Sequence, residues 1–140
     1  MYEYGCKVNR VVDGDTVDVT LDLGFSILHK CRVRLYAIDT PESRTRDKDE
    51  KARGKLAGKY LKDAIDNGKK VVLRSKLKDS KGKYGRVLGE IIVDDININV
   101  AMIENHLAVA YHGQNKDDVE AEHLINREKL IKLGVFIPKT

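Results

Sequence analysis

The sequence predicts one small α+β domain whose five short strands form a closed or partly closed barrel. Three observations predict this class. The chain has 140 residues, 41% of them hydrophobic, which suffices for one modest core and leaves little room for a second. Several segments alternate with the period of a strand, and one has the 3.6-residue period of an amphipathic helix. No repeat or linker rich in Pro, Gly or Ser divides the chain, so we expect residues 1–140 to form a single domain.

The first 40 residues predict three strands. Cys6–Val12 and Thr16–Leu23 are joined by Asp13-Gly14, a tight-turn signal, and therefore predict a hairpin. A third strand is expected within Phe25–Ile38. The alternation ends at Asp39-Thr40-Pro41, because proline cannot donate a hydrogen bond to a strand ladder. The third strand should carry two faces, one with Cys31, Val33, Leu35 and Ala37 and the other with Arg32, Arg34 and Tyr36.

The rest of the chain predicts three helices and two strands. The helix Lys51–Gly68 has its apolar residues on one stripe, and Asn67-Gly68 is expected to end it. Two strands and two further helices follow, with the loop Asp79–Gly85 between the strands. The strands are Val71–Leu77 and Val87–Val93, and the helices are Ile98–Asn105 and Asp117–Leu133.

The formal net charge of +4 conceals two strongly basic segments in an otherwise acidic chain. Ser43–Lys62 has eight basic and three acidic side chains, and Lys69–Arg86 has eight basic side chains and one acidic. A single run of this kind usually indicates a solvated face. Two runs beside a catalytic-looking motif favour a polyanionic partner instead.

Neither a membrane span nor an export signal is expected. No apolar stretch approaches the roughly 18 to 20 residues that a membrane helix needs, and the first residues lack the basic flank and apolar run of a secretory signal. The chain is therefore expected to be cytoplasmic, and a phage or plasmid origin would suit it. Cys6 and Cys31 are expected to be buried, reduced thiols, because the core is large enough to need no disulfide.

Three separated clusters could carry chemistry: Asp13-Gly14-Asp15-Thr16, the stretch Arg34–Glu42, and Lys83-Tyr84-Gly85-Arg86. Asp15 and Asp39, with a backbone carbonyl nearby, offer the hard oxygen ligands that Ca²⁺ takes. A zinc site is disfavoured, because the four histidines lack ligand spacing and neither cysteine belongs to a CxxC pair. The plain alternatives are an ordinary hairpin turn for the first cluster and surface ion pairs of Arg34 with Asp39 or Glu42 for the second.

The other side chains of these clusters suit phosphodiester hydrolysis. Arg34 and Arg86 could each present a planar donor fork to a phosphate whose transition state gathers negative charge. Glu42 follows Asp39 by three residues and is positioned to hold or deprotonate a water molecule. Metal, two guanidinium groups and a carboxylate base together predict metal-assisted cleavage of a phosphodiester.

The three clusters, in this order between these strands and helices, resemble the staphylococcal-type nucleases, or thermonuclease family, from about Cys6 to Leu133. The resemblance implies an OB-fold five-stranded β-barrel with three α-helices. It also implies a Ca²⁺-dependent nuclease that acts on DNA and RNA, on single or frayed strands, and leaves 3′-phosphate ends. A monomer is expected, with no membrane partner.

The site residues carry over by motif. The resemblance makes Asp15 and Asp39 the calcium carboxylates, and Thr40 the residue that adds its backbone carbonyl. It makes Arg34 and Arg86 the phosphate-binding arginines and Glu42 the general base or water-positioning group. Two tyrosines that lie against the bound nucleotide match Tyr84 and Tyr111.

One departure from the family pattern predicts a structural feature. Asp15 and Arg34 are 19 positions apart, which is longer than in the secreted staphylococcal enzyme, so residues Asp22–Lys30 should form an extended hairpin. Gly113 stands where that enzyme has a second tyrosine, which leaves base preference open. The rival hypotheses are a catalytically silent OB-fold module that binds nucleic acid or protein and, third, a purely structural interaction domain.

Overall fold

The computed structural model of this chain describes residues 2–76 and 87–138. Three long strands, a helix, two long strands and two helices follow one another in the predicted order. The strands are β1 (Glu3–Asp13), β2 (Thr16–Asp22), β3 (Leu28–Leu35), β5 (Val71–Ser75) and β6 (Val87–Val93). The helices are α1 (Lys48–Asn67), α2 (Ile98–Glu104) and α3 (Lys116–Lys132). Three two-residue strands, β4 (Ile38–Asp39), β7 (Ile96–Asn97) and β8 (Val109–Ala110), were not predicted.

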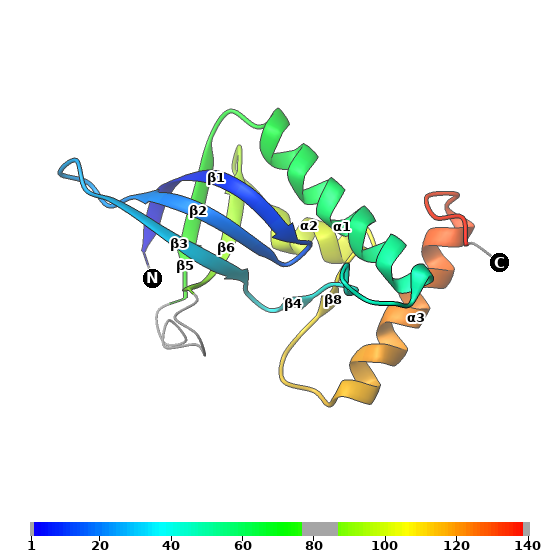
Figure 1. The fold of residues 1–140 in the computed structure, drawn as a ribbon. Helices are drawn as coiled ribbons and strands as arrows, with labels where there is room; N and C mark the ends of the chain where they lie inside the picture. Colours follow the sequence, from blue (N-terminus) through cyan, green and yellow to red (C-terminus); the bar gives the residue numbers. More distant parts are fainter. Residues whose placement is uncertain (1, 77–86, 139–140) are drawn as a thin grey trace.

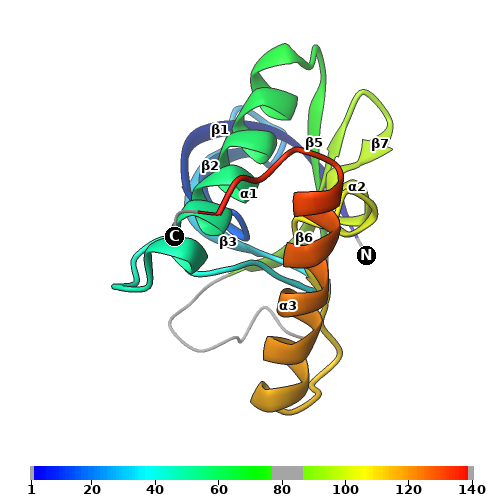
Figure 2. The same ribbon diagram turned by 90° about the vertical axis from the view of Figure 1, so that its right-hand side faces the viewer.

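The five long strands form a closed barrel. They lie in the order β3-β2-β1-β5-β6, and an additional pairing of β3 with β6 closes the ring. Neighbours in the ring are antiparallel except at this closure, which is parallel. The predicted α+β class and the OB-fold barrel with three helices are thereby confirmed. Figures 1 and 2 show the three helices gathered along the end of the barrel where β1 turns into β2.

The hairpins follow the turn signals of the sequence. The first turn is Gly14-Asp15, closed by the pair Asp13 and Thr16, one residue later than predicted. The predicted extended hairpin is present, since β2 and β3 stay paired out to Asp22 and Leu28. In Figure 1 it projects away from the helices. Phe25 at its tip is 98% exposed.

The third strand ends earlier than the alternation suggests. Ala37 was predicted on the same face as Val33, but it is exposed and has a φ of 63°, in the left-handed region. The expectation was wrong because the backbone turns at Tyr36, whose N–H donates to Gly89 O at 2.8 Å. The chain then re-enters as β4, which pairs with β8 beside α3.

Side-chain caps define the helix ends to within a few residues of the predictions. Helix α1 begins three residues before Lys51, because Asp47 accepts hydrogen bonds from the N–H groups of Asp49 and Glu50. It ends at Asn67, with Gly68 as the C-cap as predicted, although the φ of Gly68 is −84°. Helix α2 ends one residue before the prediction, and α3 begins and ends one residue early.

The predicted strand Val87–Val93 is confirmed, whereas β5 ends at Ser75. Leu77, where that strand was expected to end, lies outside the described residues, as does the loop Asp79–Gly85. No helix within residues 2–76 and 87–138 is long and apolar enough to cross a membrane.

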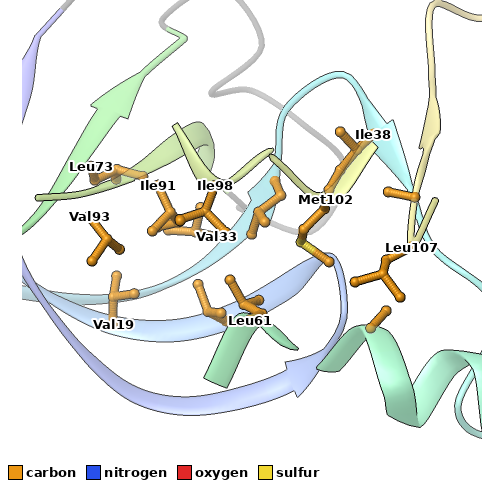
Figure 3. Close-up of a cluster of buried hydrophobic side chains, with 14 of the residues drawn as sticks. Val19, Val33, Ile38, Leu61, Leu73, Ile91, Val93, Ile98, Met102 and Leu107 are labelled. Atoms are coloured by element: carbon orange, nitrogen blue, oxygen red, sulfur yellow. The ribbon is translucent and has the colours of Figure 1, made fainter. Parts of the chain in front are cut away.

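The core fills the barrel and the space beneath α1 and α2. Figure 3 shows side chains from β2, β3, β5 and β6 converging on Leu61 of α1 and Met102 of α2. Leu61, Leu73 and Met102 have no exposed surface. Cys6 and Cys31 are free thiols, only half-buried rather than buried as predicted. Burial, and secondarily Cys31, raises the pKa of Cys6 to about 12.

Leu61 should contribute strongly to stability, because it connects α1 to the barrel and is fully buried. We expect Leu61→Ala to lower the free energy of unfolding by about 2–5 kcal/mol, through lost burial and the cavity left behind. Urea denaturation measures this difference. Leu124→Ala is the control, because Leu124 is 50% exposed, and it should change stability by less than about 0.5 kcal/mol. Equal effects of the two substitutions would contradict this assignment of the core.

Candidate active site

Two turns bring the predicted carboxylates and Arg34 together. In the ladder between β2 and β3, Thr16 lies opposite Arg34. The N–H of Leu35 donates to Asp15 O at 2.8 Å, which ties the turn before β2 to the end of β3. Asp39 follows within a few residues of that strand end, on β4. Asp15, Arg34 and Asp39 are therefore neighbours in space because of strand register, although 24 positions separate the first from the last.

The guanidinium of Arg34 lies between the two aspartates. Its Nη1 is 3.4 Å from Asp15 Oδ2, and its Nη2 is 3.6 Å from Asp39 Oδ1. The three side chains are 21%, 15% and 32% exposed, so solvent screens them less than it screens a surface pair. The Arg34–Asp39 ion pair anticipated as the plain alternative is present. The same guanidinium also faces Asp15, whereas the alternative of surface ion pairs named only Asp39 and Glu42 as partners of Arg34.

Both carboxylate oxygens of Asp15 accept a hydrogen bond. Its Oδ1 accepts a hydrogen bond from Thr16 Oγ1 at 3.0 Å, and its Oδ2 accepts one from the backbone N–H of Thr40 at 3.2 Å. Thr40 is 5% exposed. The predicted residues Asp15, Arg34, Asp39 and Thr40 therefore form one cluster.

Asp39 has a partner that sequence reasoning missed. Nε2 of His123, on α3, is 2.8 Å from Asp39 Oδ2, and His123 is 6% exposed. The sequence did contain an indication that His123 lies on the apolar face of the helix, because Val119, His123 and Leu130 recur at helical spacing. The described residues contain no group of three or more His, Cys, Asp or Glu side chains placed to hold a metal ion.

Glu42 lies in the most acidic surroundings of the site. Its backbone N–H donates to Glu50 Oε2 at 3.1 Å. Partial burial raises the pKa of its carboxyl above the usual range, and the charges of Asp13, Asp15, Glu50 and Asp39 raise it further. Asp13 and Glu50 were not among the predicted site residues. The concentration of carboxylates leaves an excess of negative charge that a cation would relieve.

Two cavities meet at Tyr111. One, of about 290 Å³, is lined by Asp39, Thr40, Glu42 and His123 among others, and the second, of about 500 Å³, by Arg34, Tyr36 and Gly113 among others. Tyr111 borders both and is 44% exposed. The other two predicted residues, Tyr84 and Arg86, lie outside the described residues.

Helix α1 packs directly beneath the loop that carries Glu42. A Cβ added to Gly54 would lie 2.6 Å from Pro41 O and 2.7 Å from Glu42 O. On the next turn, a Cβ at Gly58 would meet nothing closer than Gly14 N at 3.9 Å. Gly54 therefore allows the close approach that sets the height of the loop above the helix.

A sequence model of the family described as "Staphylococcal nuclease homologue" matches residues 32–132. This chain belongs to that family. The matched residues include Arg34, Asp39, Thr40, Glu42, Tyr111 and His123, whereas Asp15 lies before them.

Several curated proteins are similar to this member of the family. The endonuclease YhcR of Bacillus subtilis strain 168 is 34% identical over 117 residues, which are 78% of this chain and 9% of that protein. Protein ParB of Escherichia coli is 36% identical over 124 residues, 79% of this chain and 60% of that protein. The thermonuclease of Staphylococcus intermedius is 34% identical over 103 residues, 74% of this chain and 57% of that protein. The chain thus spans less than two thirds of the length of these relatives.

Gly54→Ala should destabilise the protein, because the added methyl group would overlap the carbonyl oxygens of Pro41 and Glu42. We expect a loss of about 1–3 kcal/mol in the free energy of unfolding, measured by urea denaturation. Gly58→Ala is the matched control on the same helix and should raise stability by about 0.5–1 kcal/mol, the ordinary helix preference for alanine. A gain in stability for Gly54→Ala would contradict the close packing described here.

Glu42→Gln should raise the thermal midpoint at neutral pH without divalent cations, since the raised pKa of Glu42 means that its ionised form opposes folding. The gain should disappear as the pH falls below the ordinary carboxyl pKa of about 4.3, where the side chain is protonated in both states. Differential scanning fluorimetry over a pH series measures both trends. Glu104→Gln, on an exposed position of α2, should change neither, and a lower midpoint for Glu42→Gln would contradict the electrostatic picture.

Proposed function

We propose that this chain is a calcium-dependent nuclease that hydrolyses phosphodiester bonds of DNA and RNA. Membership of the staphylococcal nuclease homologue family, with relatives named endonuclease and thermonuclease, supports nuclease activity. The observation that carries the proposal is the position of Arg34 between Asp15 and Asp39, with Glu42 lining a cavity beside Asp39. This set combines cation ligands, a phosphate-binding fork and a base within one cluster.

The donor chemistry fits calcium. Asp15 and Asp39 offer carboxylate oxygens, Thr40 offers a backbone carbonyl, and the excess of negative charge that raises the pKa of Glu42 favours a divalent cation. Two carboxylates leave coordination positions for water and for a phosphate oxygen. When bound, calcium would supply a Lewis acid that polarises the phosphodiester and stabilises charge in the transition state.

The other side chains of the site have separate roles in the proposed reaction. Arg34 would donate to phosphate oxygens, which accumulate charge as the bond to the leaving oxygen lengthens. Glu42 would hold the attacking water and accept its proton, and a pKa above the usual range makes it a better base near neutral pH. Arg86 is assigned to the phosphate as well, by motif alone.

The substrate is proposed to be a single or frayed strand that is cut to leave 3′-phosphate ends. Tyr111 is exposed between the two cavities, where its ring could stack against a base. Tyr84 is assigned the same role by motif. Exposed lysines of α1, including Lys51 and Lys55, would attract the phosphate backbone. A cytoplasmic monomer remains the proposal for location and assembly.

The proposal is tested by release of acid-soluble nucleotides from single-stranded DNA and RNA, with Ca²⁺ or with EGTA. Wild type, Asp39→Ala and Glu42→Gln are compared. We expect chelation to abolish cleavage and each substitution to reduce it by about 10²-fold or more, as removal of a base or a metal ligand does. Glu104→Gln is the matched control and should cleave as wild type does.

Undiminished cleavage by Asp39→Ala would overturn the metal assignment. A pure wild-type protein that binds DNA but does not cleave it would instead support the silent OB-fold module. Cleavage that continues in EGTA would overturn the calcium requirement while leaving the nuclease assignment in place.

A further inference from the structure

His123, a buried histidine on α3, contacts the candidate site through its Nε2 atom. Nε2 of His123 is 2.8 Å from Asp39 Oδ2, and the histidine is 6% exposed. A carboxylate that binds a cation is ionised and can only accept hydrogen bonds, so in the proposed site Nε2 of His123 is the donor. None of the roles assigned above uses this contact.

We propose that His123 is a positioning residue, which orients the Asp39 carboxylate for the cation; this rests on the proposed function of the site. Its hydrogen bond occupies Oδ2, while Oδ1 faces Nη2 of Arg34 at 3.6 Å. The carboxylate is therefore held from two sides, through different oxygens. Two fixed partners restrict rotation of the carboxylate plane, which determines where its free lone pairs point.

The helix that supplies His123 is itself fixed near this point. One turn further along, Asn126 Nδ2 donates to Ala108 O at 3.1 Å, and Arg127 Nε donates to both carboxylate oxygens of Asp49 at 3.1 Å. Ala108 directly precedes β8, whose Val109 pairs with Asp39. Figure 1 shows α3 beside β4 and β8. Helix and strand are thus tied beside the hydrogen bond, so the position of Nε2 is set by the fold.

A plainer role for His123 is to anchor α3 to the barrel. The two roles differ in what they predict for the cation. An anchor changes the stability of the fold and leaves the calcium affinity of the folded protein unchanged. A positioning residue changes the calcium affinity itself, and its loss in other metal sites lowers affinity or activity about 10- to 100-fold.

The test compares two amides at position 123. In His123→Gln the amide nitrogen takes the place of Nε2 and can still donate to Asp39, whereas in His123→Asn the shorter side chain does not reach. Calcium binding to the full chain is measured by titration calorimetry, and folding is checked by circular dichroism. We expect His123→Asn to bind calcium about 10- to 100-fold more weakly and His123→Gln to recover most of the affinity.

Two controls separate the outcomes. Leu130→Ala removes a buried side chain of the same helix away from the site, and it should lower the thermal midpoint without changing calcium affinity. Asp39→Ala should abolish calcium binding; if it binds as wild type does, the proposed metal ligand fails and the role of His123 fails with it. If Asp39→Ala loses calcium while His123→Asn keeps wild-type affinity, only the positioning role is overturned. Equal losses in His123→Asn and His123→Gln would also overturn it, because the hydrogen bond would then not be the cause.

Discussion

The parallel pairing of β3 with β6 is the constraint on which the rest of the molecule depends. Among the described residues it joins three residue pairs, from Val33 opposite Val87 to Leu35 opposite Gly89, and it closes the barrel. Gly89 also accepts hydrogen bonds from Tyr36 N and Asn99 Nδ2, so the closure, the turn after β3 and helix α2 meet at one peptide group. Arg34 lies within this pairing, opposite Leu88. The closure of the sheet therefore sets the backbone position of Arg34, and Asp15 and Asp39 flank its guanidinium.

The candidate site holds more carboxylates than cationic side chains, and the surrounding structure supplies hydrogen-bond donors to them. Asp15 accepts hydrogen bonds from a hydroxyl and a backbone N–H, and Asp39 shares a hydrogen bond with a histidine. Such donors stabilise ionised carboxylates without neutralising them, which leaves the site attractive to a cation. Partial burial, and then the charges of the neighbouring carboxylates, raise the pKa of Glu42.

The sequence predicted most of the fold because the strands are half-buried and alternate clearly, as in Thr16–Leu23. Asp15, Arg34, Asp39 and Thr40 lie together in the structure, because strand register brings the two motifs side by side. Sequence reasoning missed the turn at Ala37, because an alanine with positive φ has no composition signal. It missed His123, because a contact across 84 positions depends on how α3 docks, and single-sequence patterns describe only which face of a helix is apolar.

The contact between Asp39 and α3 has a consequence for the newly made chain. Asp15, Arg34, Asp39 and Glu42 lie between positions 15 and 42, whereas His123 on α3, which contacts Asp39, follows that residue by 84 positions. During synthesis, the barrel strands therefore emerge from the ribosome well before His123 does. The complete set of contacts in the site can form only after α3 has left the exit tunnel, so assembly of the site follows synthesis of the barrel strands.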